Sequence, residues 1–325
     1  MHVKKAKELD DNSPAKTDTK DAYVIAQMIK DGRYAEPSLQ EGVYAELREG
    51  LKIRDQLSND LQITEGRIDN WLDRYFPEFR TVFKDWDGKT ALYTLTHFPL
   101  PDEITAMSAE TLLQQWKQAV KRGVGLKKAT QLRQAAERSV GLTVGTRMAK
   151  REIQSLLKQF EQLQESIAGI DEEIEKLVKP IPGANEMIAM KGVSVLTVAT
   201  FFGEIGDIAG YEHPRQIQNL AGLTLTLHQS GKFKGQTKIT KRGRRRLRKA
   251  LYLVVRPLVV HNPAFKALHQ YYTTRPDHPL KKQESLIALS CKLIRVFYAM
   301  ATKHCQFDGE KMLQDMPQFS MQKAA

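Results

Sequence analysis

Two carboxylates near the start of the chain are the first candidates for chemistry. Asp18 and Asp21 lie three residues apart in the stretch TDTKDA. On a helix, side chains at i and i+3 share a face, so the pair can contribute to a site for a hard cation such as Mg²⁺. The same pattern is typical of a helix start, with Thr17 as the N-cap and acidic residues favoured by the helix dipole. By pattern alone, the cap is the favoured interpretation.

A serine in the C-terminal half is the second candidate. Ser230 precedes a glycine at a predicted hairpin tip. A serine that attacks a phosphate needs cations nearby, and this segment offers Lys232, Lys234 and Arg242. Serine before glycine is also common in ordinary turns, which spacing alone favours. His228 would share a strand face with Ser230, but no acidic residue near it would orient the imidazole ring.

Charge is distributed unevenly along the chain. The 325 residues carry a net charge of +12, yet no Asp or Glu occurs from His213 to Pro276. This block holds fourteen basic residues, so the rest of the chain carries a net charge of −2. A polyanion is the natural partner, because each neutralised phosphate releases counterions, although a basic solvated surface is the competing interpretation. The residues expected to contact nucleic acid here are Lys232, Lys234, Lys238, Lys241, Arg242, Arg244, Arg245 and Arg248.

A short glycine-containing turn precedes the basic block. Two helices are predicted on either side of Lys191-Gly192-Val193-Ser194. The arrangement resembles a helix-hairpin-helix, in which turn amides and a helix N-terminus point at a DNA phosphate. Gly192 and Ser194 are therefore predicted nucleic-acid contacts. A serine stands where the second glycine is usual, so an ordinary helix–turn–helix packing unit is equally compatible with the pattern.

The elements that must position these residues are mostly helical. Apolar residues recur at alternating spacings of three and four from Ile153 to Leu177, which predicts a coiled coil that ends at Pro180. Its partner is either the same helix of another subunit, which we expect, or the 39–75 helix folding back. Other helices are predicted near 18–30, 88–97, 108–121, 126–139, 264–272 and 280–303.

The basic block contains the only predicted strands. LTLTLH at 223–228 alternates as a half-buried strand does, and KFKGQTKI returns as its partner. A basic helix begins at KRGRRRLRKALYLVV, and Pro257 is expected to bend or end it. Neither a signal peptide nor a membrane-spanning run is evident, and Cys291 and Cys305 form no metal or redox motif. We expect a cytoplasmic, nucleoid-associated protein with reduced thiols and no membrane partner.

These residues resemble one known family. The stretch ELDDNSPAKTDTKDAYVIAQMIKDGRY resembles the end of the RuvC-like domain of DEDD transposases of the insertion-sequence one-ten family. MKGVSVLTVATFFGEIG, RQIQNLAGLTL and QSGKFKGQTKITKRGRRRLRKALY resemble the C-terminal transposase domain of that family. The order of acidic helix, coiled-coil arm and basic domain also matches.

The resemblance implies specific roles. Family members bind divalent metal, Mg²⁺ here, through four acids, of which Asp18 and Asp21 match the third and fourth. A serine of the C-terminal domain attacks DNA, and Ser230 is the matching residue. DNA, a structured guide RNA and other copies of the chain, joined through the coiled coil, are the implied partners. The first two acids have no counterpart in this sequence, so we expect an N-terminally truncated transposase in which Asp18 and Asp21 act as helix-end acids.

The sequence therefore predicts a mainly α protein. We expect the tail of a RuvC-like domain at 1–36, a long helical and coiled-coil arm at 37–179, and a basic C-terminal domain with a small β-hairpin at 180–325. The function expected is that of an insertion-sequence transposase, an enzyme of DNA transposition and recombination whose activity the truncation impairs. The alternative is a non-catalytic, dimeric DNA- or RNA-binding remnant or regulator.

Overall fold

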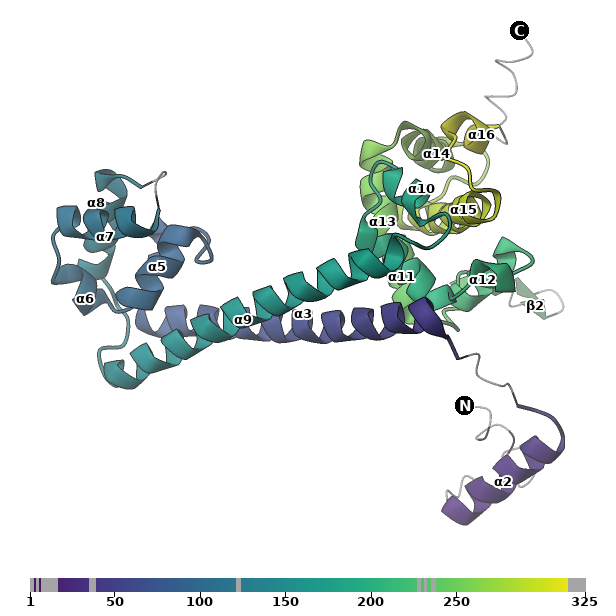
Figure 1. Ribbon diagram of the computed structural model, residues 1–325, viewed down its shortest axis with the longest axis horizontal. Helices are drawn as coiled ribbons and strands as arrows, with labels where there is room; N and C mark the ends of the chain where they lie inside the picture. Colours follow the sequence, from purple (N-terminus) through teal and green to yellow (C-terminus); the bar gives the residue numbers. More distant parts are fainter. Residues whose placement is uncertain are drawn as a thin grey trace, which may run out of the picture. The chain divides into compact units, whose positions relative to one another are not determined.

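Helices make up nearly all of the regular structure in the computed structural model (Figure 1). The structure describes residues 17–34, 39–120, 124–226, 229–230, 233–234 and 238–314, with Val3 and Ala6; for 229–230 and 233–234 it describes the backbone. The chain divides into two units, residues 1–41 and 42–325, and each is described by itself. The predicted helical fold class is confirmed.

The first unit contains helix α2, Asp18–Lys30, with the predicted bounds. The side chain of Thr17 caps it by accepting a hydrogen bond from the Lys20 amide at 3.3 Å. Val24 is buried, whereas Ile25 and Ile29 are 44% and 56% exposed. Within the described part of this unit, the predicted apolar side of the helix is therefore only partly covered.

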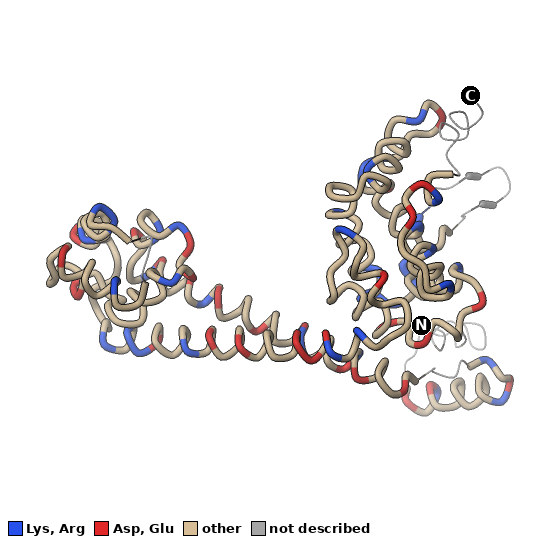
Figure 2. Tube along the Cα trace, turned by 45° about the horizontal axis from the view of Figure 1, so that its top comes forward, with Lys and Arg blue, Asp and Glu red and all other residues tan. Residues whose placement is uncertain are grey.

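The second unit is built on two long antiparallel helices, α3 (Gly42–Tyr75) and α9 (Thr146–Val178). Arg54 pairs with Asp171, and Arg74 pairs with Glu152, so residue numbers run in opposite directions along the pair. Acidic and basic residues are interspersed along both helices (Figure 2). The predicted coiled-coil helix thus has the 39–75 helix of its own chain as a partner. Whether it also joins subunits stays a prediction.

One end of this helix pair carries a cluster of short helices with its own apolar core. Trp71, Phe76, Phe79, Trp116 and Phe160 are fully buried there. The indole N–H of Trp71 donates to the Ala149 carbonyl at 2.9 Å, which ties α3 to α9. The short helices are α4 (Phe79–Val82), α5 (Lys89–His97), α6 (Pro101–Thr105), α7 (Ala109–Ala119) and α8 (Leu126–Glu137).

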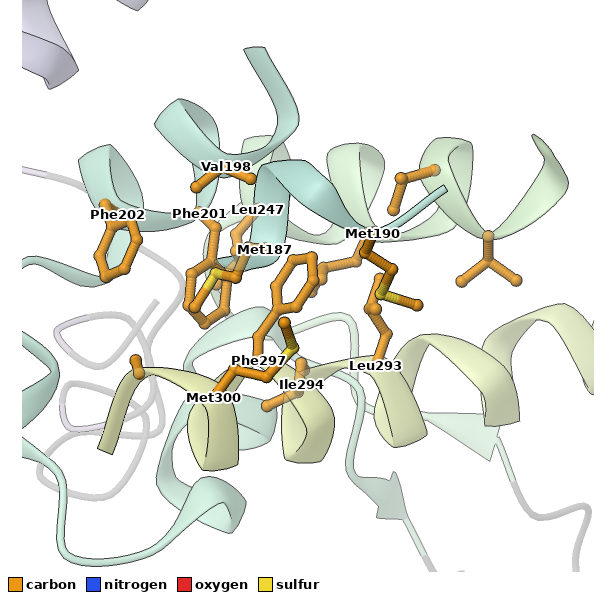
Figure 3. Packing of buried hydrophobic residues seen from close by; sticks show 14 of the residues in the cluster. Met187, Met190, Val198, Phe201, Phe202, Leu247, Leu293, Ile294, Phe297 and Met300 are labelled. Carbon is orange, nitrogen blue, oxygen red and sulfur yellow. The ribbon is translucent and has the colours of Figure 1, made fainter. Parts of the chain in front are cut away.

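The other end of the pair enters the C-terminal helical domain. Phe201 of α11, Leu247 of α13 and Phe297 of α15 meet in its core (Figure 3). Leu47 and Ile174 join the same core from α3 and α9. The helices are α10 (Ala184–Ala189), α11 (Val195–Ile205), the 3-10 helix η1 (Ile208–Gly210), α12 (Pro214–Ala221), α13 (Arg245–His261), α14 (Pro263–Thr274), α15 (Lys282–Lys303) and α16 (Gly309–Leu313).

Four two-residue strands form two antiparallel pairs between α12 and α13. β1 (Leu225–Thr226) pairs with β4 (Lys238–Ile239), and β2 (Gln229–Ser230) pairs with β3 (Phe233–Lys234). The predicted hairpin is present within the described residues as this nested arrangement. Pro257 lies inside α13, which continues to His261, so the proline does not end the helix.

Helix α15 is the single described helix that is long and apolar enough to cross a membrane by length and composition. Its apolar residues Leu289, Leu293, Ile294, Phe297 and Met300 are buried in the C-terminal core. The hydrophobicity of α15 is thus explained by packing inside this domain.

Candidate nucleic-acid interface

The turn between α10 and α11 is built around Gly192. Its φ of +99° lies in the region that favours glycine, and a Cβ atom there would approach Leu258 Cδ2 to 3.3 Å. Ser194 follows as the N-cap of α11, and its Oγ accepts from the Thr197 amide at 3.2 Å. The first amides of an α-helix have no intrahelical acceptor, so the start of this eleven-residue helix favours an anion.

A groove of about 350 Å³ begins at this turn. Gly192 and Ser194 line one side, α13 lines another with Arg246 and Lys249, and α3 contributes Asp55. The guanidinium of Arg246 pairs with Asp55 at 2.8 Å, whereas Lys249 is exposed and has no ion pair within the described residues. The fold therefore brings together the glycine turn and the basic helix, which the sequence presents about fifty residues apart.

Two of the arginines predicted to contact nucleic acid are held by the protein itself. Arg244, the N-cap residue of α13, donates to the Glu204 backbone carbonyl, and its guanidinium lies 3.7 Å from the Glu204 carboxylate. Arg248 donates to the Ala221 carbonyl at 2.8 Å. Glu204 is 5% exposed and also lies 3.8 Å from Arg246. These contacts fix the start of the basic helix.

Several other cations of the block lie at the protein surface. Lys238, Lys241, Arg242, Arg245 and Arg256 are all exposed. Gly243 sits in the turn before α13, where an added Cβ would lie 2.3 Å from the Leu220 carbonyl oxygen. Only glycine fits so close an approach, which explains the break in the KRGRRR run. Exposed cations without acidic neighbours create a surface that attracts a polyanion.

Ser230 is the last residue of β2 and pairs in register with Phe233 of β3. It thus directly precedes the connection of the predicted hairpin. The Ser230 and Lys234 side chains and the whole of Lys232 and His228 lie outside the described part of the chain. Cys291, whose thiol could act as a nucleophile by residue type, is partly buried, and burial raises the pKa of this thiol. A raised pKa disfavours the reactive thiolate.

Asp18 and Asp21 occupy the first turn of α2, where Asp18 is exposed. No group of three or more His, Cys, Asp or Glu side chains that would hold a metal occurs among the described residues. Two carboxylates alone do not fit a complete Mg²⁺ site, which needs six oxygen ligands. No catalytic step through a metal is therefore derived from these two residues.

Comparison with known proteins shows which family the sequence matches. A model described as the transposase IS116/IS110/IS902 family matches residues 184–270, the segment that holds the glycine turn and the basic helix. A second transposase model, of the DEDD type of IS110, matches residues 1–77, which include both aspartates. This chain belongs to the IS110/IS116/IS902 family of transposases. The family predicted from the sequence is confirmed.

Two relatives of this transposase resemble it along most of its length, and a third resembles about a third of it. An insertion element IS900 protein of 42 kDa from Mycobacterium paratuberculosis is 24% identical over 90% of this chain and 73% of the relative. An insertion element IS110 protein of 43.6 kDa from Streptomyces coelicolor is 22% identical over 88% of this chain and 70% of the relative. The transposase for insertion sequence element IS1111A from Coxiella burnetii is 29% identical over 34% of this chain.

Family membership supports an enzymatic activity in DNA recombination, and therefore DNA binding. Transposases of the DEDD type typically use a divalent metal. The sequence pattern missed two groove residues as site members, Arg246 and Lys249, although both were counted in the basic block. Arg246 and Lys249 are three residues apart on a predicted helix, which places both on one side of α13. The exposed Leu253 follows on the same side.

Proposed function

We propose that this transposase holds a DNA segment on the groove between α11 and α13. The observation that supports this most directly is the convergence of Gly192, Ser194, Arg246 and Lys249 on one groove. A helix start supplies amide donors for a phosphate, and the two cations supply charge. Lys238, Lys241, Arg242 and Arg245 extend the charge beyond the groove and would contact neighbouring phosphates.

Ser230 is the proposed nucleophile. Its hydroxyl oxygen would bond to a DNA phosphorus while one ester bond from phosphorus to a deoxyribose oxygen breaks. The hydroxyl proton would pass through solvent to the leaving oxygen, and Lys232 and Lys234 would offset the charge that develops on the phosphate. Support comes from family membership and from the position of Ser230 beside a strand connection, within the block that lacks acids.

Asp18 and Asp21 are proposed as two ligands of a divalent metal such as Mg²⁺. Further ligands, such as substrate phosphates, would complete the site, since no group of three or more candidate side chains occurs among the described residues. A structured guide RNA and self-association through α9 are proposed partners, carried over from the family resemblance. The proposed location is the cytoplasm, at DNA.

The test compares the full chain with two variants. R245Q/K249Q/R256Q removes three exposed cations of α13, and binding of a labelled duplex is followed by fluorescence anisotropy from 50 to 400 mM NaCl. The slope of log K against log salt is expected to fall by about three, since each lost phosphate contact contributes about 0.9. An unchanged slope would remove α13 from the interface.

The second variant, Ser230→Ala, tests the nucleophile. A nicked duplex with Mg²⁺ or Mn²⁺ is incubated with the chain, and a covalent protein–DNA adduct is sought on denaturing gels and by mass spectrometry. The adduct is expected with the native chain and absent with Ser230→Ala. An adduct that survives Ser230→Ala excludes this serine from the reaction.

A further inference from the structure

A second stretch of the chain is almost free of acidic residues. From Thr111 to Arg151 there are ten Lys or Arg residues and one acidic residue, Glu137. The net charge of these 41 residues is +9, although the whole chain outside 213–276 carries −2. The excess positive charge is therefore divided between two regions. This one lies in the helix cluster at the far end of the arm, which the basic-block prediction does not include.

The segment folds as a helical hairpin, α7 followed by α8. Leu112 and Trp116 of α7 are buried in one core with Ala129 and Leu132 of α8. The connection carries the sequence Gly-Val-Gly at 123–125, and Ala129 follows the second glycine by four residues. In sequence, Gly-hydrophobic-Gly between two helices resembles a DNA-binding helix-hairpin-helix, and both glycines are present here, unlike at the α10–α11 turn; Gly123 itself lies outside the described residues.

Five of the eight described cations of this segment are available to a ligand. Lys117, Lys127, Arg138, Arg147 and Arg151 are exposed and make no ion pair within the described part of the chain. The other three described cations of the segment interact with neighbouring side chains of the protein. Arg133 pairs with Glu137 at 3.3 Å, Lys150 pairs with Glu103, and the Lys128 ammonium lies 4.5 Å from the centre of the Phe83 ring.

The outer face of α8 has the layout of a duplex-reading helix. Lys127 and Arg138 lie on the face opposite the buried residues Ala129, Leu132 and Ala136. Arg138 follows Lys127 by eleven positions, which corresponds to a rise of about 16 Å along a helix. A DNA major groove is about 12 Å wide, so the two cations can reach phosphates on both rims. Three exposed uncharged polar residues stand between them: Thr130, Gln131 and Gln134.

We propose that the α7–α8 hairpin, with the first turns of α9, is a second surface for double-stranded DNA. It shares no residue with the groove at α11 and α13. The cations at the ends of α8 would hold the two phosphate backbones, while the polar residues between them face the base edges. A single strand or a small anion would not use cations this far apart. A transposase must hold more than one stretch of DNA, and two separate basic surfaces supply that capacity.

The test uses the full chain with three triple variants. K117Q/K127Q/R138Q removes exposed cations from the hairpin, and R245Q/K249Q/R256Q removes them from α13. K84Q/K89Q/K158Q is the matched control, because it makes the same change in charge at exposed positions outside both surfaces. Anisotropy of a labelled 40-base-pair duplex is measured against NaCl for each, with thermal unfolding as a check on the fold.

The hairpin variant is expected to lower the salt slope by about three and the affinity near 0.1 M salt by at least about tenfold, and the control is expected to leave the slope unchanged. Equal slopes for the hairpin variant and the control would overturn the proposal. If the α13 variant, and not the hairpin variant, kept the salt slope of the control, this would count against the proposed groove instead. The two inferences are therefore judged by different variants.

A second measurement does not depend on variants. The native chain is photo-crosslinked to the same duplex carrying 5-bromodeoxyuridine, digested, and its crosslinked peptides are identified by mass spectrometry. Crosslinked peptides from residues 117–151 are expected, in addition to those from the C-terminal domain. Crosslinks confined to the C-terminal domain would overturn the proposal. A single-stranded oligonucleotide that binds the hairpin more tightly than the duplex would also overturn it.

Discussion

Removing an acidic residue from the groove at α11 and α13 is expected to strengthen DNA binding. Asp55 lines this groove and pairs with Arg246 at 2.8 Å. A phosphate that binds the same guanidinium would bring its oxygens to within about 6 Å of the Asp55 carboxylate, judged from two hydrogen-bond lengths around one cation. Asp55→Asn keeps the size of the side chain and removes that repulsion.

The size of the effect follows from Coulomb's law. Two unit charges about 6 Å apart repel by roughly 0.7 kcal/mol in bulk water and by about 2.8 kcal/mol at an effective dielectric constant near 20. Because the side chain of Asp55 is 56% exposed, salt screening places the change toward the lower end, at about 1 kcal/mol. This corresponds to roughly fivefold tighter binding near 0.1 M salt.

The cost to the fold is expected to be small. An ion pair with one exposed partner contributes about 0–1 kcal/mol, and Arg246 retains Glu204 at 3.8 Å. The assay is duplex anisotropy of Asp55→Asn beside Arg246→Gln, which is expected to weaken binding. Asp60→Asn, on an exposed residue of the same helix outside the groove, is the control. Asp55→Asn binding that is no tighter than that of Asp60→Asn would refute the placement of a phosphate at Arg246.

Two further predictions concern the fold and the assembly. Burial, and after it the Lys282 ammonium, lowers the pKa of His269, whose Nδ1 lies 2.8 Å from Ser285 Oγ, so the unfolded chain binds the proton more tightly. The contribution of neutral His269 to stability is then complete above the unfolded pKa of about 6.5 and is lost as pH falls through that value. His269→Asn should therefore make the melting temperature depend less on pH between pH 5 and 8. A melting temperature with the same pH dependence as that of the native chain would contradict this. Ile167, half-buried in the middle of α9, tests self-association, because Ile167→Lys should shift an oligomer toward monomer in light scattering, whereas an unchanged mass would count against a subunit contact there.

The sequence was sufficient where local rules determine the structure. The N-cap at Thr17, the helices near 88–97 and 126–139, and the end of α3 before Pro77 all depend on capping, apolar periodicity and proline within a few residues. The family was recognisable because its motifs are contiguous in the chain. The alternating apolar pattern also predicted the small hairpin.

Contacts between residues far apart in the chain cannot be predicted from such local patterns. The heptads of α9 predict a partner helix but not its identity, because α3 of the same chain and a second copy of α9 offer similar apolar seams. The groove needed the fold to bring Gly192 beside Lys249. Arg244 and Arg248 look like their exposed neighbours in sequence, and only the positions of the Glu204 and Ala221 carbonyls show that the protein holds both guanidinium groups.

The helices α3 and α9, which lie between the two proposed basic surfaces, carry charges of both signs. A polyanion is attracted wherever cations lack acidic neighbours, and along α3 and α9 the pairs Arg54–Asp171 and Arg74–Glu152 supply such neighbours. The 33-residue α9 rises about 50 Å, which is the length of roughly fifteen base pairs. Each of these two helices has a net charge of −2, so the pair separates the two basic surfaces without offering DNA a binding track between them. Each surface can then bind and release its own duplex, as an exchange of strands between two DNA molecules requires.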